Sequence, residues 1–138
     1  MNFEFSDEQN MLREQAQSFL KAECPPQAVR TVLDGDAAFD QRLWQKVVDM
    51  GWTATVIPEE YDGLGLSYLE LSVIAEELGR CLAPLPFSSS VYLATEAILA
   101  AGTDAQKAAW LPKLASGAVI GCLADSEANG HLTAAKLT

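Results

Sequence analysis

The sequence has few of the residue types that build disulfide frameworks or metal sites. Its 138 residues include three cysteines and one histidine. Cys24, Cys81 and Cys122 are widely spaced in apolar surroundings, a pattern that supports neither a disulfide framework nor a Cys-x-x-Cys metal or redox site. A single histidine, His131, excludes sites that need two imidazoles, and with them zinc-hydrolase chemistry. We therefore predict no metal site.

Basic residues and long apolar runs are also scarce. Nine Lys plus Arg against nineteen Asp plus Glu give a formal net charge of −10, and no basic patch offsets it. Such a chain repels nucleic acids and anionic lipid surfaces. Its apolar stretches are interrupted well before the roughly 20 residues that span a bilayer, and its amino terminus lacks the basic flank of a signal peptide. These absences predict a cytoplasmic protein that binds neither nucleic acid nor membrane.

Most of the local sequence patterns indicate helices. With 49% hydrophobic residues the chain can form one packed core. Asp40 is expected to cap a helix, with Phe39 and Trp44 as its hydrophobic staple. Three segments have the spacing of a capping box: Ser6 to Gln9, Ser67 to Glu70 and Thr103 to Gln106. We therefore predict that residues 1–117 form an all-α, up-and-down bundle of about five or six helices.

Several local features are expected to interrupt or vary this bundle. We expect a short extended piece from Ala54 to Ile57, and a break or kink at Pro112. The serines at 88–90 are expected to cap a helix over Val91 to Ala101, the most apolar and therefore the most buried of the set. After Gly117 the run from Ala118 to Ala124 has the length and composition of a strand. One strand cannot be stable alone, so residues 118–138 are interpreted as the start of an incomplete β-domain.

No complete active site is visible in these residues. Glu59 and Glu60 are adjacent and diverge in direction, which suits a solvated turn better than an acid and base pair. Glu76-Glu77 is expected on a solvated helix face. The Gly63-Leu64-Gly65 turn lacks the third glycine and the preceding strand of a dinucleotide fingerprint. Glu96 lies in the most apolar helix, where it either points outward or needs a buried partner. We assign no catalytic residue.

One segment carries a family resemblance. The run from Gly51 to Ser67 reads GWTATVIPEEYDGLGLS. It closely resembles a segment of acyl-CoA dehydrogenases written roughly as G-W/L-x-x-x-x-x-P-E-E-Y-G-G-L-G-L-S. Other landmarks of that family occur in order: Phe5 to Gln9 with Leu12-Arg13, Glu76 to Arg80, and Ala101 to Lys107 before Leu111-Pro112. The resemblance extends from about Asn2 to Glu127, which in that family is the amino-terminal helical domain and the first strand of the central β-domain.

The resemblance implies a flavoenzyme that desaturates an acyl-CoA thioester. In that family a glutamate base removes the α-proton while the β-hydrogen passes as hydride to FAD, in a dry slot that aligns the reacting groups. The base comes from a carboxy-terminal helical domain, and most FAD contacts come from the β-domain and a neighbouring subunit. We therefore expect this chain to be inactive alone and not to retain FAD. An electron-transfer flavoprotein as acceptor, and a homo- or hetero-oligomer, are implied as well.

The resemblance places two partial sites on this chain. The helix from Ser89 to Ala101 is similar to one that lines the far end of the acyl pocket. The residues expected on its pocket side are Ser89, Ser90, Leu93 and Ala97, whose small members leave space for a bulky or long acyl group. Leu123, Asp125 and Ser126 are expected at the flavin, where the family has a T-E-P-x-A-G-S-D loop. Ser126-Glu127 matches the Thr-Glu of that loop, whereas its proline and its G-S-D ending are not reproduced.

That departure leaves two other interpretations open. One is a flavin-poor, dehydrogenase-like subunit that supports a catalytic partner. The other is a helical interaction module of unrelated function. The residues do not decide between these and the leading interpretation, the amino-terminal domain of an FAD-dependent acyl-CoA dehydrogenase.

Overall fold

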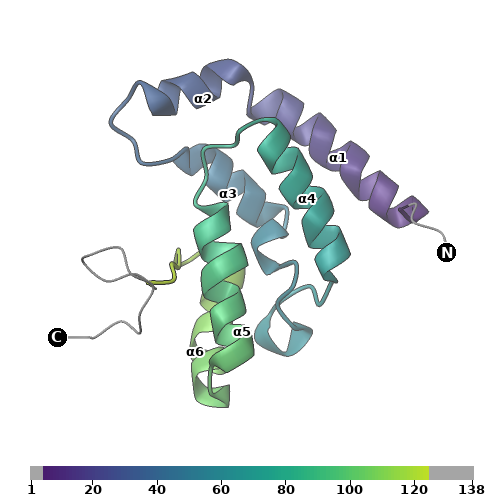
Figure 1. The fold of residues 1–138 in the computed structure, drawn as a ribbon, viewed down its shortest axis with the longest axis vertical. Coiled ribbons are helices and arrows are strands. Elements are labelled where there is room, and N and C mark those ends of the chain that lie inside the picture. The colour runs from purple at the N-terminus through teal and green to yellow at the C-terminus, as the bar shows by residue number, and fades with distance from the viewer. Residues whose placement is uncertain (1–4, 125–138) are drawn as a thin grey trace.

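The computed structural model describes residues 5–124, and this part of the chain is helical (Figure 1). The α-helices are α1 (Asp7–Glu23), α2 (Pro26–Leu33), α3 (Gln41–Asp49), α4 (Tyr68–Arg80), α5 (Glu96–Ala101) and α6 (Asp104–Ala115). Two short 3-10 turns, η1 (Trp52–Ala54) and η2 (Glu59–Tyr61), lie between α3 and α4. A π-helical segment, η3 (Ser88–Thr95), leads directly into α5. The predicted all-α class is confirmed.

The predicted helix starts are also confirmed. All three capping boxes form, at the amino ends of α1, α4 and α6. The Asp40 carboxylate accepts a hydrogen bond from the Leu43 N–H at 2.9 Å at the start of α3. Beside it the rings of Phe39 and Trp44 meet edge to face with their centroids 6.4 Å apart. Each cap satisfies amide groups that the first turn of a helix leaves unpaired.

Helices α1 and α4 lie side by side and run in the same direction (Figure 1). Three side-chain hydrogen bonds join the two helices, and their partners occur in the same order along α1 and α4. They are Gln9 Nε2 to Glu70 Oε1 at 2.8 Å, Arg13 to Glu76 at 2.9 Å, and Gln17 Nε2 to Glu77 Oε1 at 3.1 Å. Glu77 is buried, and Arg80 Nε also donates to it at 3.2 Å. The carboxylate of Glu77 is therefore paired inside the interface rather than solvated, unlike our expectation for Glu76-Glu77.

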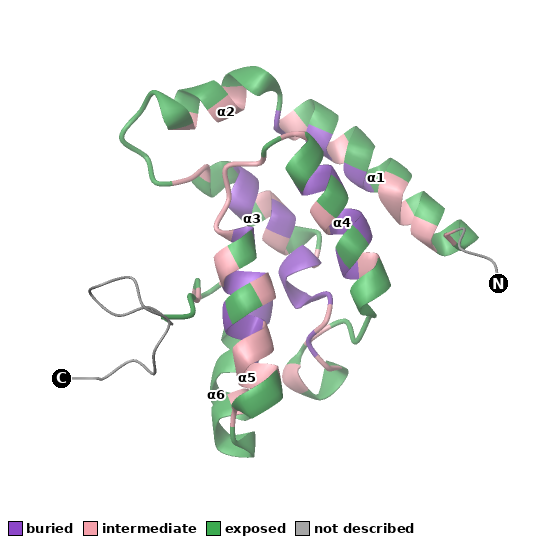
Figure 2. Ribbon diagram, in the orientation of Figure 1, coloured by how far each residue is buried: buried purple, intermediate pink, exposed green. Residues whose placement is uncertain are grey.

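The buried residues gather where the helices meet (Figure 2). The main core is formed by α1, α3 and α4 together with the start of η3, and includes Ala16, Leu43, Val47 and Ile74. A smaller core joins the segment after α3 to α6 through Ile57 and other apolar residues. None of the helices within residues 5–124 is both long enough and apolar enough to cross a membrane.

The segment between α3 and α4 is compact, and the expected extended piece from Ala54 to Ile57 is wrong. Residues 52–57 instead form η1 and a turn. Their carbonyl groups accept hydrogen bonds from the N–H groups of residues 64–66 in the same loop: Leu64 N to Ala54 O at 2.9 Å, Gly65 N to Ile57 O at 2.9 Å, and Leu66 N to Thr55 O at 2.8 Å. The threonine side chains, Thr53 and Thr55, are buried and donate to backbone carbonyls. Local hydrogen bonding has overridden the β-propensity of this stretch.

Three expectations for the second half of the chain are corrected. The serines at 88–90 do not cap the helix, because it begins one residue earlier and contains them. The helix over 91–101 is not the most buried: its buried residues are Val91, Ala94 and Thr95, all in η3, whereas α4 has five. Helix α6 continues through Pro112 without a break, and Ser116 N–H bonds the Pro112 carbonyl at 3.0 Å to complete its last turn.

The predicted strand from Ala118 to Ala124 does not form in the described structure. These residues are irregular. A strand needs a neighbouring strand to pair with, whereas here Val119 N–H bonds the Lys113 carbonyl and Gly121 N–H bonds the Ser90 side chain. The remainder of the predicted β-domain start, residues 125–138, lies outside the described residues.

Candidate functional site

An apolar groove lies between η3, α5, α6 and the segment that follows α6. Its volume is about 480 Å³. The residues that line it are Ala94, Ala97, Ile98, Ala101, Gly102, Gln106, Trp110, Leu114, Val119, Ile120, Gly121 and Cys122. Among them only Gln106 and Trp110 have side chains with a strong hydrogen-bonding group, an amide and an indole N–H. The groove is therefore suited to an alkyl or other apolar group, at about 0.8 kcal/mol for each methylene buried.

The wall of the groove is held together at Ser90 and Gly121. Ser90 is buried, and its Oγ accepts a hydrogen bond from the Gly121 N–H at 3.2 Å. A Cβ at Gly121 would stand 2.5 Å from the Cβ of Ala94, closer than real Cβ atoms approach. The backbone after α6 can therefore lie directly on η3 because both residues in contact are small.

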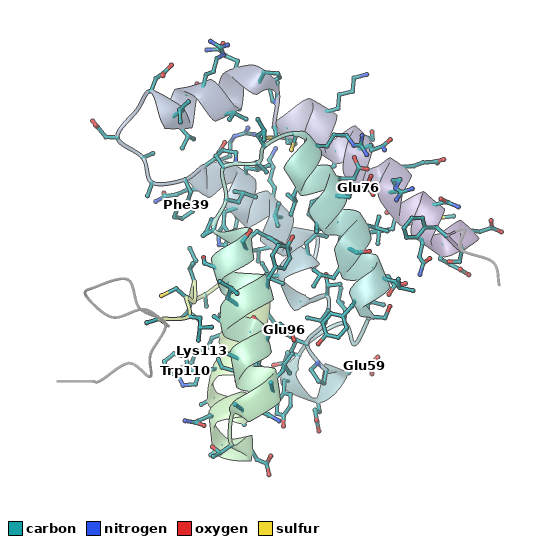
Figure 3. All side chains as sticks on the ribbon, in the orientation of Figure 1. Phe39, Glu59, Glu76, Glu96, Trp110 and Lys113 are labelled. Carbon is teal, nitrogen blue, oxygen red and sulfur yellow. The ribbon has the colours of Figure 1, made fainter. Side chains whose placement is uncertain are left out.

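The rim of the groove carries an aromatic residue that sequence reasoning did not single out. Trp110 of α6 is 47% exposed and lines the groove. Lys113 lies beside it, with its Nζ 4.9 Å from the ring centroid, within the range of a cation–π contact (Figure 3). Two features of the sequence could have indicated this wall of the groove. They are the spacing of the alanines in α5 and the position of Trp110 one helical turn before Leu114.

The four residues expected at the acyl pocket do not share one environment. Ala97 is half-buried and lines the groove. Ser90 lies beneath the groove rather than in it, bonded to Gly121. Ser89 is half-buried and donates to the Pro86 carbonyl at 3.0 Å, and Leu93 is 47% exposed outside the groove. Of the four, Ala97 lines the groove, Ser90 bonds a residue of its wall, and Ser89 and Leu93 lie away from it.

Of the residues expected at a flavin, one lies in the described part of the chain. Leu123 is 46% exposed, and its irregular backbone is not paired within a strand. Asp125 and Ser126 lie outside the described residues, as does His131.

The carboxylates considered for chemistry lie apart from the groove. Glu96 is half-buried, and its Oε2 accepts a hydrogen bond from the Tyr68 hydroxyl at 2.7 Å, while Oε1 is enclosed without a partner (Figure 3). This bond raises the pKa of Tyr68. Glu96 therefore has a partner rather than pointing freely outward. Glu59 and Glu60 are exposed in η2. Within the described residues, no carboxylate lines the groove in a position to act as a base.

A larger cavity of about 760 Å³ lies at the other end of the molecule, between α2 and the carboxyl ends of α1 and α4. It contains none of the residues expected at the acyl pocket or the flavin. Among residues 5–124, no group of three His, Cys, Asp or Glu side chains is placed to hold a metal ion.

The fold is a helical domain with an apolar groove, and among residues 5–124 no acidic or basic side chain lines this groove. Residues 6–118 match the family model described as "Acyl-CoA dehydrogenase, N-terminal domain". Because the match covers most of the sequence, the chain belongs to this family, as the resemblance predicted.

Individual relatives agree with this assignment. The chain is 36% identical to acyl-CoA dehydrogenase IpdE2 of Mycobacterium tuberculosis over 118 residues, which are 85% of this chain and 36% of that protein. It superposes on one chain of the ChsE4-ChsE5 complex of the same organism with a TM-score of 0.82 and 29% identity, covering 93% of this chain and 35% of that chain. An acyl-CoA dehydrogenase of Bacillus anthracis, complexed with FAD, gives a TM-score of 0.81 and 27% identity, covering 93% and 22%. The chain thus spans about a third or less of the length of these relatives.

Proposed function

We propose that this chain is the amino-terminal domain of an FAD-dependent acyl-CoA dehydrogenase, and that the groove beside α5 forms one wall of the acyl pocket. The observation that carries the proposal is the groove itself. It is apolar, about 480 Å³ in volume, and lined by small residues of the helix that the family resemblance relates to the acyl chain. The Bacillus anthracis relative that contains FAD supports the choice of cofactor.

The residues of this chain would bind and orient the acyl group and exclude water from it. Ala94, Ala97 and Ala101 leave the groove open, while Ile98 and Leu114 give it apolar walls. When bound, FAD supplies the hydride acceptor for desaturation between the α and β carbons. Leu123 would contact the flavin through its main chain, with Asp125 and Ser126 following it. No described residue of the groove can remove the α-proton, so the chain alone is proposed to be inactive.

We further propose that the whole protein works as a homo- or hetero-oligomer in the cytoplasm and passes electrons to an electron-transfer flavoprotein. The ChsE4-ChsE5 structure is a complex of two named components, which supports assembly from more than one chain. The negative charge of the chain disfavours nucleic acid and anionic membranes as partners.

A matched pair of substitutions in the intact protein tests the groove assignment. Ala97→Phe places a ring in the groove, whereas Ala100→Phe makes the same change at an exposed position of the same helix. Short acyl chains do not reach the added ring. For long or branched chains the overpacking costs about 1 to 3 kcal/mol, or about tenfold to a hundredfold in kcat/KM.

We expect Ala97→Phe to lower the ratio of long-chain to short-chain kcat/KM by that factor, and Ala100→Phe to leave the ratio unchanged. A lower melting temperature with an unchanged ratio in Ala97→Phe would place Ala97 in the packing core instead. That result would remove the groove from the substrate site.

A further inference from the structure

Two cysteines that are far apart in the sequence meet at one end of the fold. Cys24 ends α1 and Cys81 ends α4, and these two helices are parallel neighbours. The Cys24 Sγ lies 4.0 Å from the Cys81 carbonyl oxygen, and the Cys81 Sγ donates to the Leu78 carbonyl at 3.4 Å. Both thiols are free. No sequence pattern pairs them, because 56 residues separate them and their contact depends on how α1 packs on α4.

The environments of the two thiols differ. Cys24 is 2% exposed, whereas Cys81 is half-buried. Burial, followed by the proximity of the Cys81 thiol, raises the pKa of Cys24 to about 12. Because the thiolate is the reactive form, Cys24 is a poor first nucleophile and Cys81 is the residue that an oxidant reaches.

A cavity gives access to both residues. The cavity of about 760 Å³ between α2 and the carboxyl ends of α1 and α4 is lined by Cys24 and Cys81 alike. Arg30 and Arg80 also line it, so a cationic side chain is available near the thiols. A small oxidant can enter such a space without the helices separating.

We propose that Cys24 and Cys81 form a reversible disulfide when the protein meets a peroxide. The Cys81 thiolate attacks one peroxide oxygen, the O–O bond breaks, and Cys81 becomes a sulfenic acid with release of water. The Cys24 sulfur then attacks the Cys81 sulfur, the S–O bond breaks, and a second water leaves. Two thiols lose two electrons and two hydrogens in total, and hydrogen peroxide is reduced to two waters.

The disulfide would fix the carboxyl ends of α1 and α4 to each other. Its formation requires the Cys81 Sγ to leave the Leu78 carbonyl and turn toward Cys24. The high pKa of Cys24 makes the second step slower than for an ordinary thiol pair. A thiol reductant reverses the reaction, as expected of a cysteine pair in a reducing compartment.

The test uses the full chain carrying Cys122→Ser, which removes an exposed third thiol. The folded protein is treated with hydrogen peroxide, and its thiols are counted and its peptides mapped by mass spectrometry. We expect two thiols to disappear together, a peptide that joins Cys24 to Cys81, and a rise in melting temperature that dithiothreitol reverses. The same treatment in concentrated urea, where α1 and α4 no longer hold the two cysteines together, should yield less of the peptide that joins Cys24 to Cys81.

Single variants distinguish Cys81, which reacts with the peroxide, from Cys24, which then forms the disulfide. With Cys24→Ser added, Cys81 should accumulate as a sulfenic acid that dimedone traps. With Cys81→Ser added, Cys24 should stay reduced. The proposal is overturned if the folded Cys122→Ser protein keeps both thiols under these conditions, or if Cys81 stops at the sulfenic acid although Cys24 is present. The thiol count of the Cys122→Ser protein needs no variant at Cys24 or Cys81. It therefore tests the proposal even if those variants fold poorly.

Discussion

Replacing Gly63 with alanine should unfold the loop that carries the family motif. A Cβ at Gly63 would stand 1.8 Å from the Ile57 carbonyl oxygen and 2.3 Å from its carbon. These are backbone atoms, so no side chain can turn away to relieve the overlap. The loop cannot shift as a unit, because the N–H groups of residues 64–66 bond the carbonyls of residues 54, 57 and 55 at 2.8 to 2.9 Å.

The magnitude follows from those bonds. Relief of the overlap requires the three hydrogen bonds to break or stretch, at about 1 kcal/mol each, and it also loosens the buried Ile57. We therefore expect Gly63→Ala to lower the free energy of unfolding by about 3 kcal/mol or more. For a domain with a total stability of about 5 to 15 kcal/mol this is a large fraction.

Gly79→Ala is the matched control. Gly79 lies in α4, and a Cβ there would meet nothing within 4 Å. The same glycine-to-alanine change should raise the stability by about 0.5 to 1 kcal/mol, because alanine loses less backbone entropy in a helix. Urea unfolding followed by circular dichroism measures both variants. A Gly63→Ala protein as stable as the wild type would refute this account of the loop.

Three further predictions concern the chain itself. Hydrogen bonds, chiefly from Ser67 and then from Gln9, lower the pKa of Glu70 to about 2 from its ordinary 4.5. Glu70→Ala should therefore lower the free energy of unfolding by about 1 kcal/mol at pH 7. This difference between the variant and the wild type should vanish as the pH falls from about 4.5 toward about 2. A difference that persists at the low end would contradict the assignment. Leu82 is 74% exposed with a φ of 53°, so Leu82→Gly should raise the urea midpoint, corresponding to about 0.5 to 1 kcal/mol; a lower midpoint would count against backbone strain there. Far-UV circular dichroism of the isolated chain should be dominated by helix, and a β-dominated spectrum would disagree with the fold.

Much of the fold could be predicted from local sequence signals. Helix starts depend on a few adjacent residues, so the sequence alone identifies Ser6, Asp40, Ser67 and Thr103 as caps, and the structure has all four. The segment from Ala54 to Ile57 was interpreted wrongly because its geometry depends on bonds to residues 64–66, which a local pattern does not contain. The same reason applies to residues 118–124, whose amide groups bond Lys113 and Ser90 instead of a strand.

The candidate site was only partly predictable. Ala97 was expected at a pocket and does line the groove, whereas Leu93, on the same helix, is exposed outside it. The π-helical turns of η3 change which residues share a face, and regular α-helical spacing does not anticipate this change. Trp110 was expected only as part of α6, and its place at the rim depends on the packing of α6 against α5.

The most direct test of the central proposal is the flavin content of the intact protein and its response to acyl-CoA. We predict that the protein produced from its complete coding region purifies with about one flavin per active site, and that acyl-CoA added without oxygen bleaches the flavin absorbance. The 138-residue chain alone should be colourless and should not oxidise acyl-CoA. An intact protein that contains no flavin, and that binds none when FAD is added, would contradict the proposal and favour a flavin-poor supporting subunit.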